Sequence, residues 1–303
     1  MPIPHSPKLE GGRESHFQAF ARGKHMLWWL PAVWGLSATA PSYDLQNDVS
    51  ARRAEAQAEL GKRAAVETVE GVFVLATPPG QGSLAGTSLL TKSVLAAYFN
   101  GRFARRPAAA ISVYLFQDAQ RYEAYCRKRY AEPCGTPYGF YRPDERRIVM
   151  NIGPGIGTLT HELVHPIMEA DFPGAPEWLN EGIASLFEAL SMPAAGQIHG
   201  VKNWRHPRLL RALRSPSERD KATLPALFSL TDVQFRDADE DLHYATARYL
   251  CQWLDQHGKL WEFYQRYRDH RAEDPTGEQA FAVVTGKTPA EANASWSAWV
   301  RRL

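Results

Sequence analysis

Strand-forming patterns lie almost entirely before residue 157 of this chain, and nearly all the patterns that follow are helical. Four β-branched or aromatic runs predict strands at 71–77, 109–116, 138–142 and 147–152. The last two are separated by a Pro143-Asp144 turn and predict a hairpin. Helical periodicity predicts helices at 85–100 and 118–130, the second with Asp118 as its N-cap.

The second half of the chain is predicted to be helical. The expected helices are 158–170, 176–190, 207–214, 241–256, 258–270 and one beginning at 289. The fold class is therefore α+β, with a small mixed sheet and its helices followed by a mostly helical half. The predicted organisation is a leader at 1–45, a linker or surface helix at 46–66, an α/β subdomain at 67–157 and a helical subdomain at 158–303.

Composition indicates a globular protein and gives no electrostatic case for nucleic acid. Hydrophobic residues make up 44% of the 303 residues and charged residues 22%. The formal net charge is only +2, and the arginine clusters are scattered as on solvated helix faces. We therefore expect no nucleic-acid partner.

The N-terminal region has the layout of a secretory signal. Basic residues precede the apolar run 26–40, which ends in the small residues Ala38-Thr39-Ala40. Fifteen residues are too few to span a bilayer, which takes about 20. The sequence predicts export to a periplasmic or extracellular location, and no membrane span in the mature chain.

The three cysteines fit an exported protein. Cys126 and Cys134 flank a short segment at the end of a predicted helix, so a disulfide between them is expected in an oxidising compartment. Cys251 shares a helix face with Tyr244, Ala247 and Leu254 and is expected to be a buried free thiol.

The segment His161-Glu162-x-x-His165 carries the strongest chemical signal. Residues four apart lie on one face of a helix, so the two imidazoles can converge on one metal ion. Glu162 is placed to reach a water on that metal without being a ligand itself. Catalytic zinc takes three protein ligands, so a third must come from elsewhere.

Two glutamates of the next predicted helix compete for the third ligand position. Glu181 is favoured because Gly182 follows it and allows a facing backbone or a ligand to come close. Glu177 lies at the helix start, where a carboxylate is favourable without any metal. Pro166, directly after the second histidine, removes a backbone donor and should kink or end the first helix. The expected cofactor is one Zn²⁺ per chain.

The stretches "HELVH" and "PEWLNEGIA" resemble the gluzincin branch of the zincin metallopeptidases, and more closely peptidase-MA-type domains with a W-L-x-E-G-x-A signature. The resemblance spans roughly residues 70–300. It implies a zincin-like fold with the site between its two halves, ligation by His161, His165 and Glu181, and Glu162 as general base. More loosely, it implies Tyr244 or His243 as the group that stabilises the oxyanion.

The resulting hypothesis is a zinc metallopeptidase that hydrolyses peptide bonds. A peptide or protein substrate is expected along 147–152, if that run is an exposed edge strand. The alternatives are a zinc-binding scaffold or sensor that does not cleave, and a hydrolase of a non-protein amide such as a cell-wall crosslink.

Overall fold

A five-stranded mixed sheet organises the first half of residues 43–303, the part of the chain that the computed structural model describes. Its strands are β1 (Ala65–Val69), β2 (Phe73–Thr77), β3 (Ile111–Phe116), β4 (Gly139–Arg142) and β5 (Arg147–Asn151). Their order is β1-β2-β3-β5-β4, with β2, β3 and β5 parallel and antiparallel strands at both edges. The signal segment expected at 26–40 lies outside the described residues.

The hairpin of β4 and β5 is confirmed, but the edge position expected for 147–152 is wrong. β5 pairs with β3 on one side and with β4 on the other, so it has no free edge. All five residues of β5 are buried, as a central strand of a covered sheet requires. The edge belongs to β4, where Gly139 pairs with Met150 and Arg142 with Arg147.

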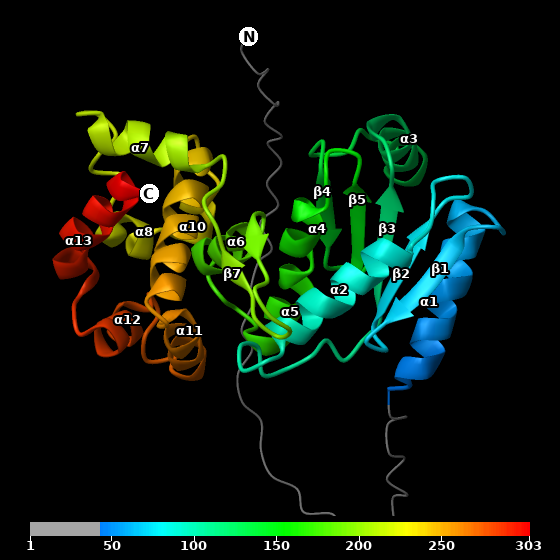
Figure 1. Ribbon diagram of the computed structural model, residues 1–303, viewed down its shortest axis with the longest axis horizontal. Coiled ribbons are helices and arrows are strands. Elements are labelled where there is room, and N and C mark those ends of the chain that lie inside the picture. The colour runs from blue at the N-terminus through cyan, green and yellow to red at the C-terminus, as the bar shows by residue number, and fades with distance from the viewer. Residues whose placement is uncertain (1–42) are drawn as a thin grey trace, which may run out of the picture. The chain divides into compact units, whose positions relative to one another are not determined.

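Helices cover both faces of the sheet. One face packs on α1 (Leu45–Leu60) and α3 (Ala119–Tyr130), with Ala56, Tyr114, Tyr122 and Val149 in the shared core. The other face packs on α2 (Ala85–Tyr98), which crosses in front of the strands in Figure 1, and on helices of the second half. The segment expected as a linker or surface helix is thus α1 and the start of β1.

Arg147 ties α1 to the sheet. Its side chain is 1% exposed, and its guanidinium lies 2.6 Å from Glu55 and 3.0 Å from Glu59, both on α1. It also donates to the hydroxyl of Tyr125 on α3. A guanidinium buried this completely must be paired, so both helices are fixed to the strand that carries it.

The second half is helical, as expected. Its helices are α4 (Gly157–Glu162), α5 (Val164–Asp171), α6 (Glu177–Leu186), α7 (His206–Arg214), α8 (Leu224–Ser229), α9 (Asp232–Phe235), α10 (Glu240–Gln256), α11 (Leu260–Asp269), α12 (Glu278–Thr285) and α13 (Pro289–Arg302). The helix expected at 176–190 ends at Leu186, and two short strands, β6 (Leu190–Ser191) and β7 (His199–Gly200), pair after it. Helix α10 lies at the centre and packs along α6. One hydrophobic core runs from the sheet face through α6 and α10 to α13.

The helix does not end at Pro166, and the expected disturbance is found as a one-residue break three positions earlier. The helix breaks at Leu163, between α4 and α5, because Pro166 has no N–H to donate to the Glu162 carbonyl. Leu163 keeps right-handed helical dihedral angles, so the chain continues in helical course to Asp171. No helix among residues 43–303 is long and apolar enough to cross a membrane.

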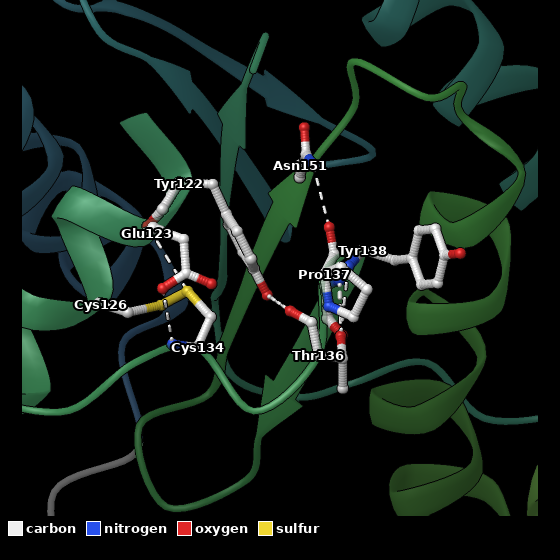
Figure 2. The surroundings of a disulfide bond; sticks show 9 residues. Tyr122, Glu123, Cys126, Cys134, Thr136, Pro137, Tyr138 and Asn151 are labelled. Atoms are coloured by element: carbon white, nitrogen blue, oxygen red, sulfur yellow. Dashed lines mark hydrogen bonds between the residues drawn. A yellow bond between two sulfur atoms is a disulfide. The ribbon is translucent and has the colours of Figure 1, made fainter. Parts of the chain in front are cut away.

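The expected disulfide between Cys126 and Cys134 is present, and Cys251 is a buried free thiol. The bridge joins α3 to the loop that leads into β4 (Figure 2). The same loop is held by the Tyr122 hydroxyl, which donates to the Thr136 carbonyl at 2.9 Å. The disulfide therefore anchors the approach to the edge strand.

We expect reduction of this disulfide to lower the free energy of unfolding by about 2–3 kcal/mol, because the bridge no longer restricts the conformations of the unfolded chain. That corresponds to a melting temperature lower by roughly 5 °C for a chain of this size. Melting curves with and without reductant measure the effect. A Cys126→Ser/Cys134→Ser variant is the control and should not respond to reductant. An unchanged melting temperature of the wild type in reductant would contradict the expectation.

Candidate metal centre

His161, His165 and Glu181 come together although 15 residues separate the second histidine from the glutamate. Their potential ligand atoms all lie within 4.8 Å of one another. The two imidazole rings project from the same side of the α4–α5 course, with centroids 5.0 Å apart. The helical convergence expected from the sequence is therefore confirmed, and Glu181 is the carboxylate that completes it.

Both imidazoles turn Nδ1 away from the centre. In His161, Nδ1 lies 3.4 Å from a carboxylate oxygen of Glu188. In His165, Nδ1 lies 3.0 Å from Oδ1 of Asn180. A hydrogen-bond partner on the outer nitrogen orients an imidazole and leaves Nε2 for the centre, as around metal-ligating histidines in general. His165 has such a partner, whereas Nδ1 of His161 lies near Glu188 without a hydrogen bond among the described residues.

Glu181 divides its two oxygens between different neighbours. Oε1 accepts a hydrogen bond of 2.6 Å from Arg236. Oε2 is buried and has no hydrogen-bond donor among residues 43–303, although it lies 3.2 Å from Nε2 of His161. Burial alone would raise the pKa of Glu181, but His165, His161 and Arg236 hold it well below its ordinary value. The group is a carboxylate with one oxygen directed at the histidines.

Glu177 is not part of this group. Its carboxylate lies 2.7 Å from Arg236, and its backbone N–H donates to Asp232. Both contacts satisfy it away from the histidines, so the preference for Glu181 is supported by the structure.

A close helix crossing sets the position of Glu181. At Gly182 a Cβ atom would lie 3.0 Å from Sγ of Cys251 and 3.1 Å from the carbonyl oxygen of Ala247, both on α10. Few side chains tolerate such contacts, so glycine lets α6 and α10 approach. The approach that Gly182 was expected to allow is confirmed, and the backbone that comes close is that of α10.

Glu162 is buried beside the three candidate ligands. Its carboxylate lies 3.8 Å from Nε2 of His165. Burial raises its pKa above the ordinary value of a glutamate, and the neighbouring His161 and His165 only partly oppose this. A general base works best when its pKa approaches the working pH, and the pKa of Glu162 is shifted in that direction.

Tyr244, and not His243, faces the site. The Tyr244 hydroxyl accepts a hydrogen bond from Arg236 and lines the same cavity as His161 and Glu162. Burial and the nearby Glu181 carboxylate raise its pKa, so the phenol keeps its proton. His243 is buried, with Nδ1 3.1 Å from the Phe235 carbonyl oxygen, and lines neither cavity at the site. The alternative of His243 as oxyanion donor is therefore not supported.

Sequence reasoning missed four residues around the ligands: Asn180, Glu188, Arg205 and Arg236. Arg205 holds Glu188 through two hydrogen bonds of 2.8 and 3.0 Å. Asn180 directly precedes Glu181, which is the one signal that could have marked it. No sequence motif identifies Arg236 as a residue of the site, because its partners lie on two other elements, α6 and α10.

The donor set fits a divalent transition-metal ion. Two imidazole nitrogens and one carboxylate oxygen converge, and the Oε2 atom of Glu181 lacks a donor among the described residues. A buried acceptor of this kind is costly unless something binds it. Three N and O ligands without cysteine are also typical of catalytic zinc.

Comparison with known families places the site inside a matched segment. Residues 155–276 match the family model described as "Protein of unknown function (DUF1570)". That segment contains the three candidate ligands, Glu162, Arg236 and Tyr244, and it excludes the sheet. No curated protein matches the chain.

We expect purified protein to bind one Zn²⁺ per chain, and His161→Ala and Glu181→Ala to lose it. Glu177→Ala is the matched control, since it removes a carboxylate one turn away that does not face the histidines. Elemental analysis measures the zinc content of each variant after dialysis against a buffer that contains a trace of Zn²⁺. Full zinc content in His161→Ala or Glu181→Ala would exclude the assigned ligands.

Proposed function

We propose that this protein is a zinc-dependent metallopeptidase that hydrolyses peptide bonds. The observation that carries the proposal is Glu162, a buried carboxylate of raised pKa placed beside two imidazoles and a carboxylate that fit a metal ion. A site that only bound metal would not need this additional acid–base group. The resemblance to gluzincins, noted from the sequence, points to the same chemistry.

Bound Zn²⁺ would supply a Lewis acid that polarises the scissile carbonyl and lowers the pKa of a nearby water. Glu162 would take a proton from the attacking water and deliver it to the leaving amine nitrogen as the C–N bond breaks. Tyr244 would donate a hydrogen bond to the oxyanion that forms on the carbonyl oxygen. Arg236 fits a supporting role, because it contacts the Tyr244 hydroxyl and Oε1 of Glu181.

The edge strand β4 is the best candidate for binding the substrate backbone. Gly139, Phe140 and Tyr141 of β4 line the cavity that also contains His161 and Glu162. β4 pairs only with β5 among the described residues, so its other edge is free to pair with an extended peptide. This assigns to β4 the role that the sequence had suggested for 147–152.

An exported location fits the chemistry of the fold. The disulfide between Cys126 and Cys134 persists in an oxidising compartment and is rare in a reducing one. We therefore retain a periplasmic or extracellular location as part of the proposal.

Glu162→Gln should abolish cleavage of a peptide library while leaving the zinc content unchanged. The amide keeps the size of the side chain and cannot accept the proton, and loss of a general base costs about 10²- to 10⁴-fold in rate. Mass spectrometry of the library and elemental analysis of the same samples measure both effects. Zinc-loaded wild type that cleaves no peptide would refute peptidase activity; the test would then turn to non-protein amides and to a non-cleaving scaffold.

Tyr244→Phe should lower kcat by about 10²- to 10³-fold with little change in KM, because it deletes one donor to the oxyanion and keeps the packing. His243→Ala should leave turnover near normal, since His243 contacts the Phe235 carbonyl and not the cavity. Steady-state kinetics on one peptide, with melting temperatures for both variants, decide between them. Normal kcat in Tyr244→Phe would remove this residue from the mechanism.

A further inference from the structure

Two cavities meet at the candidate centre. One has a volume of about 580 Å³ and the other about 720 Å³. The residues that line both are Thr136, Gly139, His161, Glu162, Arg236 and Tyr244. They therefore form one cleft with two arms, and Glu162 lies where the arms join.

The arms extend in opposite directions along the helix that carries the histidines. The first is lined by Met168, Glu169 and Phe172, which follow His165, and the second by Gly157 and Thr158, which precede His161. Gly157 and Glu169 are 169 − 157 = 12 residues apart, or about 18 Å along a helix at 1.5 Å per residue. An extended peptide covers that length with about five residues. A substrate can therefore continue on both sides of the bond to be cleaved.

The cleft has no free cation to hold a C-terminal carboxylate. Arg205 and Arg236 are the only lysine or arginine residues that line the arms in the described part of the chain. Arg205 makes two hydrogen bonds to Glu188. Arg236 is shared among three glutamates at 2.6–3.1 Å: Glu177, Glu181 and Glu240. Both guanidinium groups are already neutralised.

Most of the carboxylates are paired with a guanidinium as well, so none of the paired ones is reserved for an N-terminal ammonium, although carboxylates outnumber guanidinium groups and leave the cleft negative. Glu177, Glu181 and Glu240 pair with Arg236, Glu188 with Arg205, and Asp241 with Arg208. Apart from Glu162, the exception is Glu169, which is exposed and accepts from the Tyr141 hydroxyl at 2.8 Å. An exposed carboxylate of this kind binds a hydrated ammonium weakly.

The geometry points to an endopeptidase: we infer that the cleft binds an extended polypeptide along both arms and that cleavage falls at internal bonds. An exopeptidase must block one arm or fix a charged terminus, and the described cleft does neither. The inference rests on the proposed peptidase function and specifies its class of substrate.

The second arm also indicates which side chains it accepts. Tyr138 and Trp204 line it and are 51% and 68% exposed, an unusual exposure for large rings. The carboxylates and the arginines around them are paired, so the accessible surface there is mainly that of the rings. An aromatic or large aliphatic substrate side chain would bury it. We assign such a preference to the side of the scissile bond that faces Trp204.

The test uses two random peptide libraries about twelve residues long, enough to fill both arms. One library is acetylated and amidated at its ends, and the other has free ends. Zinc-loaded wild type should cut both libraries at internal bonds at rates that agree within about twofold. Immobilised Glu162→Gln should retain both libraries equally. Blocked peptides that are neither cut nor retained, while free peptides are, would overturn the inference.

Three variants sharpen the result. Glu169→Gln should leave the ratio of the rates on free and blocked peptides as in the wild type, whereas an aminopeptidase that used Glu169 to bind the ammonium would lose activity on the free peptides alone. Trp204→Ala should lower kcat/KM for peptides with an aromatic residue on one side of the cut by roughly fivefold. Val233→Ala, an exposed apolar position outside both arms, should not.

Measuring binding and cleavage separately distinguishes a failure of the endopeptidase inference from a failure of the proposed peptidase function. Retention of blocked peptides by Glu162→Gln without cleavage by the wild type would refute the peptidase and keep the two-armed binding cleft. Retention of neither library would overturn the cleft inference itself. Cleavage confined to the terminal residues would keep the peptidase and overturn the endopeptidase assignment.

Discussion

The buried carboxylate of Glu181 is the charge around which the rest of the site is arranged. An ionised carboxylate in a protein interior is unfavourable unless it is paired. Arg236 neutralises it from one side through Oε1, and the imidazoles of His161 and His165 face Oε2 from the other. Because the crossing at Gly182 brings α6 close to α10, this carboxylate has little freedom to move away. The geometry of the three candidate ligands thus depends on a helix crossing at Gly182, a residue that is not itself a ligand.

The sheet supplies the opposite wall of the cleft. Its edge strand β4 lies beside the helix of the histidines, and the loop before β4 is fixed to α3 by the disulfide. Thr136, in that loop, lines both arms of the cleft. The two halves of the chain also share one hydrophobic core. A wall from the sheet therefore faces the candidate ligands from the helices, an arrangement that fits the proposed binding of a substrate between them.

Both arginines that line the cleft are paired with glutamates. Glu188 lies between Arg205 and the outer nitrogen of His161, so one ion pair lies beside a candidate ligand and removes a free cation from the second arm. Arg236 does the same for Glu181 on the other helix. The guanidinium of Arg205 also lies over the rings of Trp204 and Tyr244, at 4.2 and 4.6 Å from their centroids. This part of the wall is therefore built from stacked rings and paired charges.

Local sequence patterns predicted much of the fold and of the candidate site. The positions of His161, Glu162 and His165 on one helix follow from a period of 3.6 residues, and the short loop between Cys126 and Cys134 made their disulfide predictable. The division into a sheet-bearing half and a helical half was likewise readable from periodicity.

Relations between elements were decided only by the tertiary structure. Which strand lies at the edge depends on strand order, which placed β4 outside β5. The exclusion of Glu177 and of His243 from the site depends on how α6 and α10 are rotated about their axes. Arg236 was invisible because its partners lie up to 59 residues away in sequence. Sequence periodicity fixes the face of a helix on which a residue lies, but only packing against neighbouring elements fixes where that face points.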